Sequence, residues 1–75
     1  MVPRTIPPGG DSAKQIIDEA DASTTYVGWA LRGTATSEAK WLIKRILVSG
    51  TTTTTEWAST KHDQEWDDRA TLSYS

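Results

Sequence analysis

Four acidic residues near the C-terminus are the best candidates for a metal site: Asp63, Glu65, Asp67 and Asp68. The spacing of the first three matches the first ligands of a calcium-binding loop. The sixth position of that loop, which needs glycine, is Asp68, and the twelfth, which needs a bidentate glutamate, is Tyr74. With no cysteine and a single histidine, one copy also lacks the ligands for a thiolate or multi-histidine site. We therefore expect no metal and no cofactor, and a solvated acidic loop for which Arg69 is an ionic partner.

A serine, a histidine and a carboxylate occur close together in the sequence, as Ser59, His62 and Asp63. Their spacing follows neither a nucleophile elbow nor another known catalytic arrangement. Two carboxylates for glycoside hydrolysis would need a cleft between rigid walls, and 75 residues offer little material for one. We therefore expect no enzymatic activity.

The chain has four tryptophans and two tyrosines but no phenylalanine. Each such ring buries ~150–250 Å² and keeps a polar atom that suits the rim of an interface. Trp41, central in its segment, is expected in the core. Three others are candidates for core, subunit interface or sugar-stacking platforms: Trp29, Trp57 and Trp66. Because aliphatic residues are few, core and interface are favoured, with Arg45 and Arg69 as half-buried partners of carboxylates or tryptophan rings.

Composition and charge limit the classes of partner that we expect. The net charge is −2 with both signs interspersed, so we expect no nucleic-acid partner and no anionic membrane surface. Apolar runs are only a few residues long, which argues against a membrane span. The N-terminus has one arginine, three prolines and no apolar h-region, unlike a secretory signal. A single domain of 75 residues without disulfide staples buries only ~60% of its unfolded surface, so we expect a homo-oligomer or another packing partner.

The stretch 38–50 is the element around which the others are organised. It is rich in β-branched and aromatic residues and ends at a Ser-Gly turn signal. Read with a period of two, one side is apolar with an arginine gap: Trp41, Ile43, Arg45 and Leu47. The other side is mixed: Leu42, Lys44, Ile46 and Val48. A helix would place Lys44 and Arg45 on the same face as Trp41, a poor core stripe, so a strand is predicted.

The segments on either side of this stretch also have the composition of strands. Residues 24–31 are predicted as a strand, in which Gly28 indicates a bulge or a close approach of another backbone, as beneath a tryptophan. Residues 32–37 are predicted as a loop of small, turn-forming residues. The threonine run 51–55, continued by 56–58, is predicted as an edge strand after a hairpin corner at 48–51. A flexible threonine-rich loop is the alternative.

The two ends of the chain are less regular. Residues 59–64 are predicted as a polar loop, Trp66 and Ala70 are spaced for one helical turn, and 71–75 alternate like a last short strand. Residues 1–10 hold three prolines and paired glycines, which exclude regular structure. They are either a loose terminus or an extended arm along a neighbouring subunit, with Val2 and Ile6 as anchors.

Residues 11–21 admit two interpretations. Ser12 and Gln15 resemble a capping box, and four apolar residues recur at helical spacing: Ala13, Ile16, Ile17 and Ala20. The alternative is a strand through 14–18 that turns at 19–23 into the next strand.

Several segments, taken in order, resemble a group of small proteins of tailed bacteriophages. They are Tyr26-Val27-Gly28, Gly-Thr-Ala-Thr-Ser at 33–37, Trp-Leu-Ile-Lys-Arg-Ile at 41–46, Glu56-Trp57-Ala58, and Trp-Asp-Asp-Arg-Ala-Thr-Leu-Ser-Tyr-Ser at 66–75. The likeness covers 14–75 and leaves 1–10 outside it. It implies a non-enzymatic component of the virion, and it favours the strand over the helix within 11–21.

These observations predict an all-β fold, a small antiparallel sheet, sandwich or half-barrel with an extended arm. The arm is assigned to residues 1–12 and the compact domain to 13–75. Core residues are expected to include Tyr26, Trp41, Ile43, Ile46 and Leu72. Interface contacts are expected from Val2, Ile6, Trp29 and Trp57.

The expected function is a structural component of a tailed-phage virion, assembled in the host cytoplasm as a repeated subunit among other virion proteins. Its place is head decoration, neck, tail or fibre attachment. The alternative is a receptor- or glycan-binding module that uses exposed tryptophans as platforms. A third option is a regulatory protein that binds a host partner inside the cell.

Overall fold

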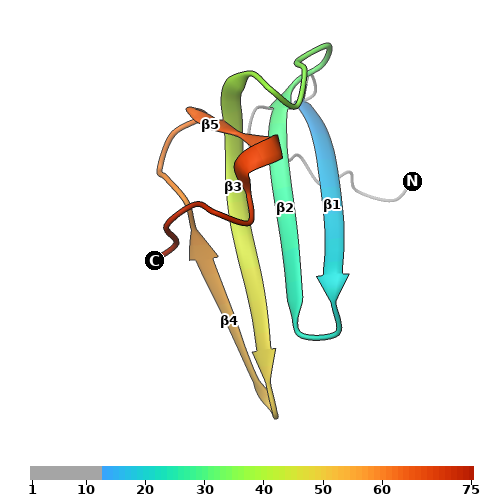
Figure 1. Cartoon of the computed structure of the whole chain (residues 1–75), viewed down its shortest axis with the longest axis vertical. Helices are drawn as coiled ribbons and strands as arrows, with labels where there is room; N and C mark the ends of the chain where they lie inside the picture. The colour runs from blue at the N-terminus through green and yellow to red at the C-terminus, as the bar shows by residue number, and fades with distance from the viewer. Residues whose placement is uncertain (1–12) are drawn as a thin grey trace, which may run out of the picture.

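The computed structural model describes residues 13–75, which form the expected all-β antiparallel fold. Four strands lie side by side in chain order, and a short fifth strand pairs with β3 (Figure 1). The strands are β1 (Ala13–Asp21), β2 (Thr24–Leu31), β3 (Ala39–Ser49), β4 (Thr52–Trp57) and β5 (Gln64–Glu65). One 3-10 turn, η2 (Trp66–Asp68), follows β5. The expected arm, residues 1–12, lies outside the described residues.

The central stretch is a strand, as predicted from its composition. β3 has eleven residues and pairs with β2, β4 and β5, so its β-branched and aromatic side chains meet neighbours on both sides. The ambiguous segment is also a strand, because β1 forms a continuous ladder with β2 from Ala13 to Glu19. Tertiary pairing here outweighs the local capping signal.

Two tight turns join these strands. Between β1 and β2, the carboxylate of Asp21 accepts hydrogen bonds from the backbone N–H of Ser23 at 2.8 Å and from its hydroxyl at 2.9 Å. These bonds hold the pKa of Asp21 below its usual value. Between β3 and β4, Gly50 has a φ of +62°, a conformation that glycine adopts without a Cβ penalty. The predicted hairpin corner is therefore present.

Strand register divides the sheet into two faces. Ile16, Gly28 and Ile43 are aligned on one face, which we call the core face. Ile17, Val27, Lys44 and Trp57 are aligned across the four strands on the other, which we call the outer face. The period-2 division predicted for β3 is thus confirmed.

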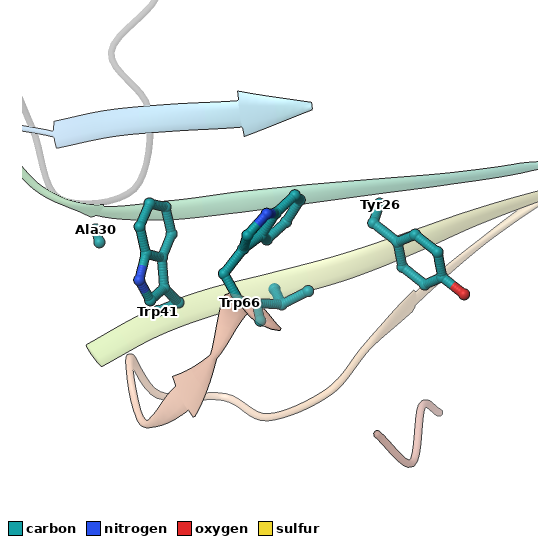
Figure 2. Close-up of a cluster of buried hydrophobic side chains, with 5 residues drawn as sticks. Tyr26, Ala30, Trp41 and Trp66 are labelled. Atoms are coloured by element: carbon teal, nitrogen blue, oxygen red, sulfur yellow. The ribbon is translucent and has the colours of Figure 1, made fainter. Parts of the chain in front are cut away.

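The core face carries the buried cluster of the protein. Trp41 and Ile43 have no exposed surface, and the rings of Trp41 and Trp66 lie 6.0 Å apart, centroid to centroid. Figure 2 shows these two indoles side by side against β2, with Tyr26 further along the same strand. Trp66 comes from η2, so the segment after β5 folds back over the core face (Figure 1). It supplies the second layer that this face needs.

Two details of the chain end differ from prediction. Residues 71–75 are not a strand, because their side chains pack down on the core face and leave the backbone unpaired with the sheet until Ser75. Ser75 alone exchanges both backbone hydrogen bonds with Trp57, at 3.0 and 3.1 Å. The predicted polar loop at 59–64 ends one residue early, since Gln64 begins β5. That two-residue strand is set by pairing with β3 rather than by its own sequence.

Candidate functional site

The outer face is the most unusual surface of the molecule. Within residues 13–75, every large hydrophobic side chain that remains exposed lies on it: Ile17, Leu31, Val48 and Trp57. Ile17 and Leu31 are 57% and 62% exposed. No second layer of strand or helix from the described part of the chain packs on this face. Large exposed apolar side chains that gather on one face of a sheet indicate an interaction surface.

Two tryptophans and a lysine form a cluster on the outer face, the Trp–Lys cluster (Trp29, Lys44 and Trp57). Trp29 comes from β2 and Trp57 from β4, and their rings stack across β3 with centroids 5.9 Å apart and planes 26° apart. The Nζ of Lys44 lies 5.2 Å from the Trp29 ring and 5.7 Å from the Trp57 ring. Both cation–π contacts hold the ammonium group at the surface while its aliphatic stem covers apolar rings.

The two tryptophans of this cluster differ in exposure. Trp29 is 6% exposed, and its indole Nε1 is buried without a hydrogen-bond partner in the described part of the chain. Trp57 is 37% exposed. A groove of about 440 Å³ lies beside it, lined by Leu42, Trp57, Ala58, Ser59, Thr60 and Ser75. A flat ring next to hydroxyl groups can stack on an apolar surface or on a sugar.

On the core face, the C-terminal segment is fixed to the sheet by a band of charged and aromatic groups. Asp18, Tyr26, Arg45 and Glu56 are aligned across the four strands. Arg45 donates to the Glu56 carboxylate at 2.6 Å, and the Nε of Arg69 donates to Asp18 at 3.0 Å. The predicted half-buried pairing of both arginines with carboxylates is confirmed, since all four side chains are about one-quarter to one-third exposed. The predicted pairing of Arg69 with the acidic loop is wrong, because the fold brings Arg69 to Asp18 on β1 instead.

Both arginines also lie over aromatic rings. The guanidinium carbon of Arg69 is 4.7 Å from the Trp66 ring centroid, as the sequence suggested for a tryptophan. That of Arg45 is 4.6 Å from the ring of Tyr74 instead. These contacts tie η2 and the chain end to β1 and β3. The C-terminal segment therefore covers the core face, and the outer face is the side of the sheet through which a partner would bind.

Tyr74 has the largest pKa shift in the described residues. Burial raises the pKa of Tyr74 to about 12, and the nearby Tyr26 adds to this, while Arg45 and Arg69 act in the opposite direction. Its hydroxyl donates to the carbonyl oxygen of Arg69 at 2.7 Å. The protonated phenol is therefore the form that the folded state favours.

Replacing this tyrosine by phenylalanine is expected to change stability in opposite senses at neutral and alkaline pH. At neutral pH, Tyr74→Phe should cost about 1 kcal/mol, because the carbonyl of Arg69 loses its donor. A folded pKa raised above 10.0 means that the stability it contributes is complete below pH 10 and is lost as pH rises through 12. The variant lacks this loss. Urea unfolding of both proteins at neutral pH and near pH 11 tests the prediction. The same difference in free energy of unfolding between the two proteins at both pH values would contradict it.

The residues considered for chemistry lie in the loop before β5, in β5 itself (Glu65) and in η2. Hydrogen bonds from Ser59 and Gln64 hold the pKa of Asp63 below its usual value. No hydrogen bond joins His62 to Ser59 or to Asp63 in the described part of the chain. Across residues 13–75, no three histidine or acidic side chains gather closely enough to hold a metal ion.

The structure distributes the other predicted residues over both faces. Tyr26, Trp41 and Ile43 lie in the buried cluster, with Leu72 packed against it. Ile46 is partly buried on the outer face, where register aligns it with Thr25 and Thr55. Trp29 and Trp57 meet in the Trp–Lys cluster. Val2 and Ile6 fall outside the described residues.

Sequence reasoning missed several outer-face residues. The sequence does not mark Ile17, Leu31 and Val48 as contacts, and it indicates Lys44 only as part of the mixed side of its strand. Alternation within β3 already placed Lys44 and Val48 opposite Trp41. The register between strands, which brings Trp29 and Trp57 to the two sides of Lys44, has no signal in a single sequence.

No family model matches the chain, and searches of curated proteins and of solved structures find no match either. No helix in the described residues is long and apolar enough to cross a membrane.

Proposed function

We propose that this protein is a non-enzymatic structural component of a tailed-phage virion that assembles as a repeated subunit. The observation that carries the assembly role is the outer face, on which all the exposed large hydrophobics of residues 13–75 gather. The phage assignment rests on the ordered pattern of segments from Tyr26 to Ser75 that resembles small phage proteins.

The layers of the fold support a role in assembly. A sheet with apolar side chains on both faces needs a covering layer on each. The C-terminal segment covers the core face, and within 13–75 nothing comparable covers the outer face. A subunit of this kind completes its core through association, so its stability depends on its partners. Such dependence suits a building block of a shell, ring or fibre.

Quantitative mass spectrometry of gradient-purified particles of the encoding phage tests this proposal. A simple ratio to the major capsid protein would support decoration of the head, and a few copies to a few tens would support the neck, tail or fibres. Absence of the chain from purified particles, together with abundant free protein in the lysate, would refute the virion role and favour a regulatory protein.

Removing residues 1–10 is expected to separate folding from assembly. The strand pairs and the buried cluster that the structure describes are formed by residues 13–75 among themselves, so the shortened chain should keep its fold. If the segment acts as an arm on a neighbour, incorporation into particles should fall at least about tenfold. Circular dichroism checks the fold, and particle mass spectrometry checks incorporation. Normal incorporation of the shortened chain would refute the arm but not the virion role.

The groove beside Trp57 favours a second candidate, a receptor- or glycan-binding module. Tryptophan fluorescence during titration with host surface polysaccharide tests it. A saturable change that Trp57→Ala abolishes would support binding at the groove. Leu31→Ala is the matched control, because Leu31 is exposed on the same face but does not line the groove. No response at any concentration would reject this candidate.

A further inference from the structure

We infer that the outer face binds the outer face of a second copy of this chain, so that two sheets pack as a β-sandwich around a two-fold axis. This inference deepens the proposed assembly role, on which its place in a particle rests. It commits to the partner as another copy rather than a different protein.

The first step is the chemistry of the face. Its exposed apolar side chains come from all four main strands: Ile17, Leu31, Val48 and Trp57. They are therefore spread over the whole sheet instead of forming one pocket for a small ligand. Two sheets that pack face to face bury a layer of this shape, with the strands of one sheet about 30° from those of the other.

The second step is the balance of charge. Among the paired residues of the outer face, register places one cation, Lys44 on β3, and one anion, Glu19 on β1. Alternation from Leu42 adds Lys40, 70% exposed, at the end of the same face and outside that register. The centre of the face is complementary to itself, because each copy can offer Glu19 to the partner's Lys44. An isologous interface repeats that pairing twice. A strongly acidic or basic partner would find no matching surface.

The third step is size. Four strands about 4.8 Å apart, of nine, eight, eleven and six residues at about 3.3 Å each, give a face of about 500 Å². Two such faces bury about 1,000 Å² together, which reaches the lower bound for a specific protein interface. The face is thus large enough for a dimer and small enough for that dimer to dissociate on dilution.

Sedimentation velocity of the full chain over a wide concentration range tests the inference. We expect a monomer–dimer equilibrium. Ile17→Glu and Val48→Glu should each raise the dissociation constant at least about tenfold, because a carboxylate would be buried at the interface without a partner. Both side chains are already exposed in the single copy, so the fold should survive, which circular dichroism checks.

The threonine strand supplies matched controls. Thr53 and Thr54 are neighbours of the same type and both are exposed, but Thr53 is aligned with Val48 on the outer face and Thr54 with Leu47 on the core face. Thr53→Glu should weaken the dimer, and Thr54→Glu should leave it unchanged. Equal effects of the two variants would overturn the inference, since the outer face would not be the contact.

A full chain that stays monomeric at every concentration would also overturn it. The cover of the outer face would then be residues 1–12 or another virion protein. Failure here is distinct from failure of the proposed function, because particle mass spectrometry measures the virion role independently. A dimer in solution that never enters particles would leave the inference standing and remove the phage assignment.

Discussion

Gly28→Ala is expected to lower the free energy of unfolding by about 1–3 kcal/mol, the usual cost of overpacking a core. A Cβ atom built on Gly28 would lie 2.6 Å from Cε3 and 2.7 Å from Cζ3 of Trp66. It would also lie 3.2 Å from Cε3 of Trp41. Carbon atoms do not approach so closely without a shift of one partner, so the indole of Trp66 has to move.

Neither ring moves easily. Trp66 is 5% exposed and lies under the guanidinium of Arg69, and Trp41 is fully buried. The Trp41 Nε1 donates to the carbonyl of Ala35 at 3.0 Å, which fixes its orientation. Alanine also restricts the unfolded chain more than glycine does, a gain of about 0.4–1 kcal/mol. That gain is smaller than the expected strain, so the net effect is destabilising.

A double-mutant cycle separates the clash from other effects of alanine in a strand. Trp66→Leu removes the ring that Gly28 supports, so Gly28→Ala should cost less in that background than in the natural chain. Urea unfolding followed by circular dichroism gives the four free energies. A variant Gly28→Ala that is as stable as the natural chain would show that Trp66 does not rest on this glycine.

Gly28 also shows which features of the fold the sequence alone predicts. A glycine amid strand-forming residues predicted a bulge or a close approach of another backbone, as beneath a tryptophan. The placement beneath a tryptophan is confirmed, but the group that comes close is a side-chain ring and not a backbone. The ladder is continuous through Gly28, so the alternative of a bulge is excluded. The sequence does not indicate which tryptophan covers Gly28. Trp66 lies far from Gly28 along the chain, and only the fold brings the two together.

The chain end illustrates the opposite case. Residues 71–75 alternate like a strand, but alternation describes only which side chains share a face. Because of this alternation, Leu72 and Tyr74 point to the same side and pack on the core face. The backbone of this segment crosses above the sheet. Likewise the three strand tryptophans, Trp29, Trp41 and Trp57, divide between the two faces according to strand register. Period-2 reasoning sorts residues within one strand, but register between strands depends on pairing that no local pattern encodes.

Trp41→Ala is expected to be the most damaging single substitution, with a loss of about 3–5 kcal/mol. Trp41 is 0% exposed and contacts the ring of Trp66. Its truncation opens a cavity in the middle of the core face and removes the donor that holds Ala35. Domains of this size have a total stability of roughly 4–11 kcal/mol, so the variant should be partly or wholly unfolded at room temperature.

Trp57→Ala is the matched control, since it deletes the same side chain from the outer face. Trp57 keeps 37% of its surface exposed, so truncation removes fewer contacts and leaves no closed cavity. Both variants should be unfolded in urea at the lowest workable protein concentration, because association of copies would otherwise add to the stability of the folded state. We expect Trp57→Ala to cost less than half as much as Trp41→Ala. Equal losses in this dilute regime would mean that a single copy already buries both faces of its sheet, and would remove the physical basis for pairing through the outer face.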